Sequence, residues 1–285
     1  MKIAYITDSG TGSSIDEMAK DKIFAVPLQI EVEGKNYFDL ETIKNSDVIN
    51  NLKSDKKMST SLPSMGLIDE LFAKIKKENF DKVIAVPICS GLSGTINAFK
   101  LSADNHGITF DYLDCYVTAE VQKYLIKYLK EAISDKDINE EIAFKNAKEV
   151  IKSCNTILIP DDLKHLSKSG RLTPFAAGVG NFFNIKPILK INEETSGKID
   201  VIDKVRTFKK AMQKVLEIMM NDIDNKDYEI YIAHVDNPIL AKEFETLIKP
   251  YFNENAIKII ELCNPVAIHT GIGCLAIQYF KKVSE

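Results

Sequence analysis

The sequence predicts an α/β protein with two domains. Apolar runs alternate with segments of helical period along the chain, and polar turns follow several of the apolar runs, as in sheets flanked by helices. The length of 285 residues fits two domains of roughly 100–200 residues each. We expect residues 1–155 to form a domain with a mainly parallel sheet and residues 156–285 to form a second α/β domain with a mixed sheet.

The first domain begins with an apolar strand at residues 2–6. A second strand-like stretch covers residues 23–32, and Gly34 after it predicts a turn. Continuous apolar runs predict buried strands, and apolar residues at helical spacing predict helices. The other strands are expected at residues 83–88 and 109–113, and the helices at residues 43–52, 65–76, 117–133 and 140–152, with one more directly after Thr95.

The second domain begins with a strand at residues 156–159. The turn Thr195-Ser196-Gly197 between two apolar stretches predicts a hairpin of residues 188–191 and 199–205. The motif His269-Thr270-Gly271-Ile272-Gly273 is expected to open a final helix. Between the hairpin and this motif, the pattern predicts helices at residues 208–220 and 240–249 and strands at residues 228–233 and 257–262.

Composition excludes several classes of protein. With 37 Lys plus Arg against 41 Asp plus Glu and a net charge of -4, the chain lacks the basic surface typical of nucleic-acid binding. No apolar run approaches the roughly 20 residues that cross a membrane, and the first ten residues include an aspartate too early for a secretory signal. Five cysteines without a Cys-x-x-Cys pair indicate reduced thiols and no zinc site. We therefore expect a cytoplasmic protein without a metal.

Three hydroxyl-rich turns in the first half follow a predicted strand or precede a predicted helix. They are Thr7-Asp8-Ser9, Thr60-Ser61 and Ser90 to Thr95. Ligands of open α/β sheets bind at the carboxyl ends of strands, where hydroxyls and helix N–H groups favour an anion. Helix capping is the alternative explanation for each turn. Both readings stay open from the residues alone.

Ser93 raises the alternative of a stand-alone hydrolase. It lies in Gly91-Leu92-Ser93-Gly94-Thr95, which resembles a nucleophile elbow but lacks its last glycine. A hydrolase would also need a histidine and an acid beside the serine. A phosphotransferase acting on a small acid is the related alternative, although the chain contains no Gly-x-x-x-x-Gly-Lys-Ser/Thr phosphate loop for ATP.

The second half contains the cationic candidates. Only two of the basic residues are arginines, Arg171 in a Ser-Gly-Arg turn and Arg206 at the end of the predicted hairpin. Their planar donors suit a carboxylate or a phosphate, and structural ion pairs explain them equally well. His269 has the same two explanations. The stretch from Phe175 to Phe183 is suited either to line an apolar pocket or to let two helices pack closely.

Taken in order, these motifs resemble the DegV family. The resemblance covers residues 3 to about 280 and rests on these segments: Thr7-Asp8-Ser9, Thr60-Ser61-x-Pro63-Ser64, Ser90-Gly91-Leu92-Ser93-Gly94-Thr95, Leu163-x-x-Leu166-x-x-x-Gly170-Arg171, Lys186-Pro187-Ile188-Leu189, Arg206-Thr207 and His269-Thr270-Gly271-x-Gly273. It implies a two-domain α/β protein that binds one long-chain fatty acid between or within its domains. Members of the FakB type present the fatty acid to a separate ATP-dependent kinase, which makes an acyl phosphate for phospholipid synthesis.

The resemblance also implies a role for individual residues. The carboxylate would be held by Thr60, Ser61, Ser93, Gly94 and Thr95. The head group, its phosphate or the kinase would meet Arg171, Arg206, His269 and Thr270. The acyl chain would lie against Phe175, Ala176, Val179, Phe182, Phe183 and Ile188. The implied partners are the fatty acid and the catalytic protein of the kinase, with transient contact to a membrane or an acyltransferase, and no catalytic residue or cofactor belongs to this chain itself.

Overall fold

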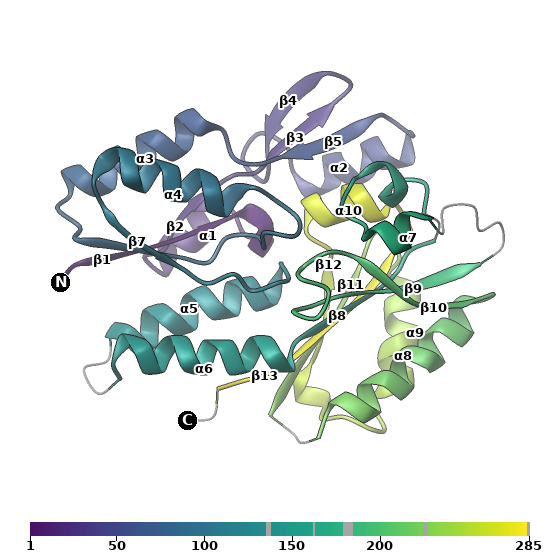
Figure 1. Cartoon of the computed structure of the whole chain (residues 1–285). Coiled ribbons are helices and arrows are strands. Elements are labelled where there is room, and N and C mark those ends of the chain that lie inside the picture. Colours follow the sequence, from purple (N-terminus) through teal and green to yellow (C-terminus); the bar gives the residue numbers. More distant parts are fainter. Residues whose placement is uncertain (135–137, 162, 179–184, 225–226, 284–285) are drawn as a thin grey trace.

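The computed structural model describes residues 1–134, 138–161, 163–178, 185–224 and 227–283. It confirms the α/β fold with one parallel and one mixed sheet (Figure 1). The parallel sheet has the strand order β2-β1-β6-β7. Its strands are β1 (Ile3–Asp8), β2 (Phe24–Val26), β6 (Lys82–Ala85) and β7 (Thr109–Tyr112).

Helices cover both faces of the parallel sheet. Side chains of β1 alternate between two cores: Ile6 packs in the core that contains Phe72 and Phe99, and Tyr5 packs in the core that contains Leu125. Burial on both faces explains why these strands appear in the sequence as continuous apolar runs. The helices of this half are α1 (Ile15–Lys20), α3 (Met65–Lys77), α4 (Thr95–His106), α5 (Glu120–Ser134) and α6 (Glu140–Ser153), preceded by the short 3-10 helix η1 (Ser9–Thr11).

A small antiparallel sheet was not predicted. It has the order β4-β3-β5 and consists of β3 (Gln29–Val32), β4 (Lys35–Phe38) and β5 (Met58–Ser61), with α2 (Asn45–Lys53) between β4 and β5. The stretch 23–32, predicted as one strand, is divided between two sheets at Pro27, which has no N–H for a sheet ladder. The predicted turn is confirmed, since Glu33 and Gly34 both have positive φ (49° and 84°) in a tight hairpin loop.

The second sheet has six strands in the order β10-β9-β8-β13-β11-β12. Its hairpin β9–β10 is confirmed as antiparallel. The strands are β8 (Asn155–Ile159), β9 (Lys186–Ile191), β10 (Asp200–Val205), β11 (Tyr228–His234), β12 (Ile257–Glu261) and β13 (Leu275–Lys281). The helices are α7 (Pro174–Gly178), α8 (Phe208–Asp222), α9 (Pro238–Ile248) and α10 (Asn264–Thr270), with the 3-10 helices η2 (Leu166–Lys168) and η3 (Glu254–Ala256).

The prediction of a final helix is wrong. His269 belongs to the last turn of α10, and the residues after Gly273 form β13 in the interior of the sheet, between β8 and β11. Six consecutive residues of β13, Leu275 to Phe280, are buried. A strand buried on both faces lacks the alternation of apolar and polar residues that would have distinguished it from a helix.

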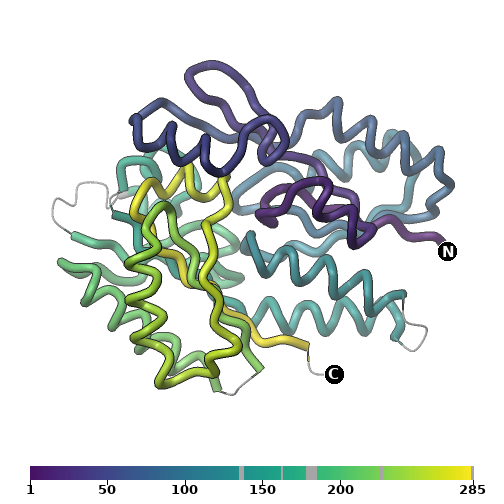
Figure 2. Tube along the Cα trace, turned by 180° about the vertical axis from the view of Figure 1, so that it is seen from behind, coloured from purple at the N-terminus to yellow at the C-terminus, as the bar shows by residue number. Residues whose placement is uncertain are grey.

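The six-stranded sheet has two different buried faces. One face, with Ile157, Ile230 and Ile277, packs on α8 and α9. The other face is directed toward the first half of the chain, where α5 contacts both β1 and β13. Figure 2 shows from behind how β13 runs past the α5–α6 pair. The domain boundary at residue 155 stays a prediction, although the chain enters the six-stranded sheet at Asn155.

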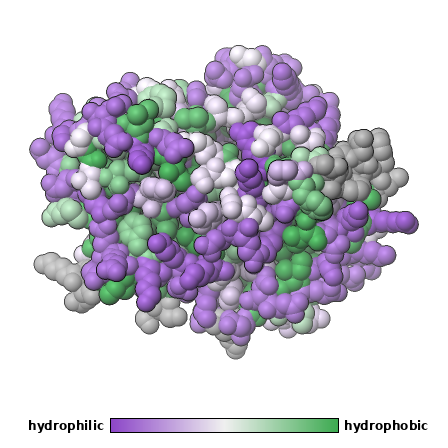
Figure 3. Space-filling view, viewed as in Figure 1, coloured by the Kyte–Doolittle hydropathy of each residue, from purple (hydrophilic) through white to green (hydrophobic). Residues whose placement is uncertain are grey.

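The outer surface is mixed. On the face seen in Figure 3, hydrophilic residues predominate and hydrophobic residues form scattered groups. Within the described ranges, no helix is both long enough and apolar enough to cross a bilayer. The five cysteines are free thiols, and all of them are buried.

Candidate functional site

The first part of the site joins the small sheet to α10. Thr60 on β5 lies opposite His269, and its Oγ1 is 2.7 Å from His269 Nε2. Burial lowers the pKa of His269 to about 4, with smaller contributions from the positive charges of Arg171 and His165. His269 is therefore a neutral hydrogen-bonding group at pH 7.

Buried polar contacts fix the start of α10. Asn264 Nδ2 donates to Asp39 Oδ1 at 2.8 Å, and Ser9 Oγ donates to Asp39 Oδ2 at 2.6 Å. Burial raises the pKa of Asp39 to about 6, although the hydrogen bonds from Ser9 and Asn264 favour its ionised form. This carboxylate ties α10, and with it His269, to the first half of the chain.

Asp39→Asn should change how stability depends on pH. The folded pKa of Asp39 lies above its usual 3.8, so its contribution to stability is full below about pH 4 and is lost as the pH rises through 6. The free energy of unfolding of the variant relative to wild type should therefore increase between pH 4 and pH 7, by on the order of 2 kcal/mol. Urea unfolding at several pH values measures this difference. Asp16→Asn on the exposed side of α1 is the control, and equal trends for both variants would contradict the prediction.

The second part of the site is the loop before α4. Leu92 N and Ser93 N both donate to Cys89 O, at 3.0 and 3.1 Å, and Ser93 Oγ lies 2.9 Å from Thr95 Oγ1. Gly94 is the N-cap residue of α4 and provides no side chain to cap the helix amides. The start of this 12-residue helix therefore presents N–H groups and two hydroxyls together, an arrangement that favours an anion.

Close backbone packing holds this loop against the second sheet. A Cβ atom on Gly91 would lie 2.3 Å from the backbone carbonyl of Gly197, which belongs to the turn after β9. Only glycine fits at residue 91 without a shift of the backbone. The loop that contains Ser93 is thus fixed beside the β9–β10 edge of the six-stranded sheet.

Arg171 completes the polar end of the site. Its Nε donates to Leu92 O at 3.4 Å, and its Nη1 donates to Ser169 O. These contacts place the half-buried guanidinium beside the loop of Ser93. The neighbouring Leu172 forms a parallel bridge with Ile199, so Arg171 also lies near the β10 edge of the sheet.

A cavity extends from this polar end across the face of the six-stranded sheet. Its empty space, counted together with the part that is open to solvent, is about 880 Å³. Small side chains on facing positions of the central strands leave room for it, since Ala233 pairs with Ala276 in register. One wall of the cavity is the sheet with the residues at its strand ends: Ile191, Ile199, Thr156, Leu158, Gln278, Ala276, Tyr231, Ala233, Ile260 and Leu262. The opposite wall comes from loops, helices and the strand β5: Leu28, Thr60, Ser61, Ile88, Leu92, Ser93, Thr118, Ala119, Pro265, Val266, His269 and Thr270. Arg171 lies at the polar end.

The polar groups in the middle of the cavity are already satisfied. Gln278 Nε2 donates to Thr118 O at 2.9 Å and to Thr156 Oγ1 at 2.8 Å, and its Oε1 accepts from Val121 N at 3.0 Å. Both amide hydrogens are used, so Gln278 does not require water or a polar ligand. Among the described lining residues, Arg171 is the only one with a full charge at pH 7. The cavity is therefore apolar along its length and polar at one end.

Comparison with known proteins identifies the family. The family model described as "Uncharacterised protein, DegV family" matches residues 2–282. The chain belongs to the DegV family. It is 33% identical over 282 residues to a DegV domain-containing protein of Clostridium acetobutylicum, and the alignment covers 99% of each chain.

Two solved DegV structures are similar to the whole chain. A fatty-acid-binding DegV family protein from Streptococcus agalactiae superposes with a TM-score of 0.88 at 27% identity, covering 99% of each chain. DegV from Bacillus subtilis, described as a fatty acid binding protein, superposes with a TM-score of 0.83 at 25% identity, covering 99% of this chain and 100% of the other.

Most of the predicted head-group residues come together in this DegV fold. Thr60, Ser61, Ser93, Arg171, His269 and Thr270 all line the cavity. Gly94 lines a second, open depression that shares Thr60, Ser61, Leu92, Ser93 and Arg171 with the cavity, and Thr95 is buried against Ser93. Thr60 and Ser61 lie within β5 of the small sheet. The expectation that they form a turn at the edge of the parallel sheet is wrong.

Other predicted residues lie elsewhere. Arg206 follows the end of β10, is exposed, and is not among the residues that line the cavity. Phe175 is 69% exposed, and Ala176 is buried in the core without lining the cavity. Ile188 packs against α8 on the opposite face of the sheet, because side chains alternate along β9 and Ile191 takes the cavity side. Val179, Phe182 and Phe183 lie outside the described residues.

The geometry does not favour the hydrolase alternative. Ser93 is hydrogen-bonded to Thr95, and the histidine of the cavity, His269, is hydrogen-bonded to Thr60. A serine nucleophile requires a base within hydrogen-bonding reach. Asp8 at the end of β1 accepts from Gly10 N, Ile88 N and Gln122 Nε2. No group of three acidic, histidine or cysteine side chains suited to a metal occurs in the described part of the chain.

The walls of the cavity were missed by sequence reasoning. They come from alternate residues of β8, β11, β12 and β13, where Thr156, Ala233, Ala276 and Gln278 are small or polar. The only signal in the sequence is that these small or polar residues stand among large apolar residues of the same strand, an even number of positions from the other residues that line the cavity. That signal requires the strand assignment, which was wrong for β13.

Proposed function

We propose that this chain binds one long-chain fatty acid in the cavity and presents its carboxylate to a separate ATP-dependent fatty acid kinase. The observation that carries the proposal is the shape of the cavity, which is apolar across the sheet and polar at the end formed by Thr60, Ser93 and Arg171. The fatty-acid-binding DegV protein from Streptococcus agalactiae supports it by likeness over the whole chain.

The polar end suits a carboxylate. A carboxylate that leaves water needs several hydrogen bonds or a positive partner. The hydroxyls of Thr60, Ser61 and Ser93 and the first N–H groups of α4 supply the hydrogen bonds, and Arg171 supplies the charge. The buried Thr95 acts through its hydrogen bond with Ser93. Neutral His269 supports Thr60, and Thr270 completes the wall behind them.

The apolar lining of the cavity suits an acyl chain. Burial of each CH₂ contributes about 0.8 kcal/mol. A chain of roughly fifteen methylenes therefore contributes on the order of 10 kcal/mol before the costs of association are subtracted. Such a ligand should remain bound during purification.

The position of the polar end is consistent with presentation to a kinase. The open depression shares five residues with the cavity, including Ser93 and Arg171, so the carboxylate would lie beside the surface. A carboxylate oxygen would take the γ-phosphoryl group of ATP held by the kinase, and ADP would leave. Exposed Arg206 would then act on the phosphate or the kinase rather than on the acyl chain.

The decisive experiment is the identification of the bound ligand. Protein denatured and extracted into organic solvent should release about one fatty acid per chain in mass spectrometry. A ligand-free preparation that also fails to bind added fatty acid would contradict the proposal.

An activity assay distinguishes the proposal from the hydrolase alternative. ATP consumption should require both the loaded chain and a fatty acid kinase. Ester hydrolysis by the isolated chain that is lost in Ser93→Ala would support the hydrolase instead.

Thr60→Ala should weaken the binding of fatty acid. The variant removes a hydroxyl that lines the polar end and its hydrogen bond to His269. A hydrogen bond contributes about 0.5–1.5 kcal/mol, so we expect a loss of affinity of about two- to thirteenfold in fluorescent fatty acid displacement. Ser59→Ala, exposed and one residue earlier on β5, is the matched control. Equal affinities for the two variants would remove Thr60 from the head-group site.

A further inference from the structure

The end of the cavity opposite Arg171 lies over β11 and β12. Arg171 lies near β10, at one edge of the sheet, whereas Tyr231 and Ile260 belong to the two strands at the other edge. Neighbouring strands are about 4.8 Å apart, so β11, four strands along from β10, lies about 19 Å away from it. An extended chain advances roughly 1.25 Å with each carbon–carbon bond of about 1.5 Å. With its carboxylate at Arg171, a long-chain fatty acid would thus reach Tyr231 with its methyl end.

Several contacts fix the ring of Tyr231. The ring stacks on Phe280 with an interplanar angle of 7° and 6.2 Å between centroids. Lys258 Nζ lies 5.1 Å from the ring centroid and donates to the Tyr231 hydroxyl oxygen at 3.4 Å. Lys258 is itself held by Glu229 Oε2 at 2.7 Å. A ring held in this way can act as a wall, because its displacement breaks several contacts at once.

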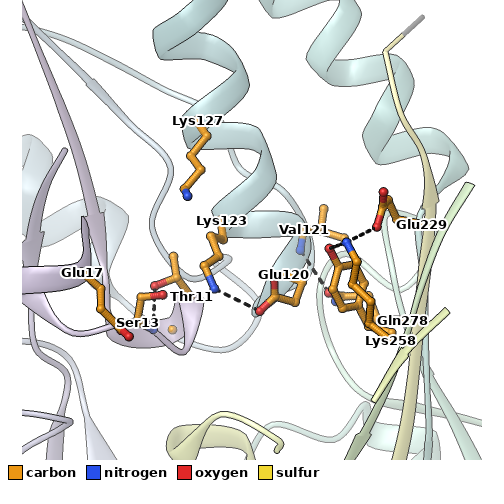
Figure 4. Close-up of polar contacts among 12 residues, drawn as sticks. Thr11, Ser13, Glu17, Glu120, Val121, Lys123, Lys127, Glu229, Lys258 and Gln278 are labelled. Atoms are coloured by element: carbon orange, nitrogen blue, oxygen red, sulfur yellow. Dashed lines mark hydrogen bonds and ion pairs between the residues drawn. The ribbon is translucent and has the colours of Figure 1, made fainter. Parts of the chain in front are cut away.

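Charged groups lie around the far side of this ring. Figure 4 shows Lys258 joined to Glu229, and Gln278 joined to Val121 at the start of α5, where Glu120 also lies. Burial raises the pKa of Tyr231, and the negative charges of Glu120 and Glu229 contribute in the same direction. The hydroxyl is therefore neutral at pH 7 and lies toward the charged groups, while the ring lines the apolar cavity.

We propose that the ring of Tyr231 is the end wall of the cavity and sets the longest fatty acid that this chain binds well. This inference rests on the proposed function. Each methylene that fits before the ring adds burial, whereas a longer chain must displace the ring or meet the Lys258–Glu229 pair. Affinity should therefore rise by about fourfold with each methylene up to one chain length, the break point, and stop rising beyond it.

The test is a series of affinities for saturated fatty acids of increasing length, measured by displacement of a fluorescent fatty acid. For wild type the series should show the break point. Tyr231→Ala opens the end of the cavity and should move the break point to longer chains. Ala233→Leu, also on β11 and also lining the cavity, should move it to shorter chains and serves as a second test if Tyr231→Ala does not fold.

Two controls separate the end wall from general effects on the strand. Tyr231→Phe keeps the ring and should keep the break point. Tyr228→Ala makes the same truncation on the opposite face of β11, where Tyr228 packs with α8 and α9, and should also keep it. If wild type binds fatty acids and a folded Tyr231→Ala variant keeps the wild-type break point, the inference is overturned while the proposed function stands; if Tyr231→Ala does not fold, an unchanged break point in Ala233→Leu overturns it. If wild type binds no fatty acid of any length, the proposed function itself is overturned.

Discussion

Replacing Ala276 with phenylalanine is expected to abolish the binding of long-chain fatty acids. Ala276 lies on β13 in the interior of the sheet, pairs with Ala233 and Leu158, and directs its methyl group into the middle of the cavity. A phenyl ring there occupies the path of several methylenes, each worth about 0.8 kcal/mol, so affinity should fall by on the order of a hundredfold or more. The ring fills existing space, so thermal stability of the ligand-free protein should not fall.

Two measurements check this result. Mass spectrometry of the extracted protein should show less than one-tenth of the fatty acid found with wild type, and thermal unfolding should show a folded protein. Ala19→Phe, on an exposed position of α1, is the matched control and should retain its ligand. A folded Ala276→Phe variant with full occupancy would show that the acyl chain lies elsewhere.

The parallel strands and the long helices of the first half followed from the sequence, whereas the short helix α1 did not. The parallel strands are short apolar runs, and the long helices have clear apolar faces. The spacing of apolar residues and the length of each segment therefore distinguished strands from helices. The small antiparallel sheet could not be predicted, because β4 contains only four residues with exposed or half-buried side chains. Whether Thr60 lies in a loop or a strand depends on pairing with β3, which is a tertiary contact.

The polar end of the site could be predicted, and its apolar wall could not. Thr60, Ser93, Arg171 and His269 stand out as polar residues in short motifs, and the fold brings them together. The wall is built from single residues on several strands that are far apart in the sequence and share only one face of one sheet. Phe175 and Ile188 illustrate the difficulty, since apolar character alone does not tell which face of an element a side chain occupies.

Arg171→Ala should weaken the binding of fatty acid much more than Arg206→Ala. Arg171 lines the cavity beside Leu92 and Ser93, whereas Arg206 is exposed beyond the end of β10. A hydrogen bond to a charged group contributes about 1.5–3 kcal/mol, so loss of Arg171 should reduce affinity by about ten- to a hundredfold. Arg206→Ala should bind fatty acid like wild type and transfer phosphate more slowly when the kinase is present.

The pair of variants separates holding of the carboxylate from transfer of phosphate. Both remove an arginine, both leave the charge of the chain one unit more negative, and only Arg171 lies within hydrogen-bonding distance of the loop of Ser93. Calorimetry with a single fatty acid measures binding, and acyl phosphate formation with saturating fatty acid measures transfer. Equal losses of binding in both variants would mean that overall charge attracts the ligand. A loss of binding in Arg171→Ala alone would mean that Arg171 contacts the carboxylate directly. The exposed charge of Arg206 acts on the ligand only through water and is screened by salt.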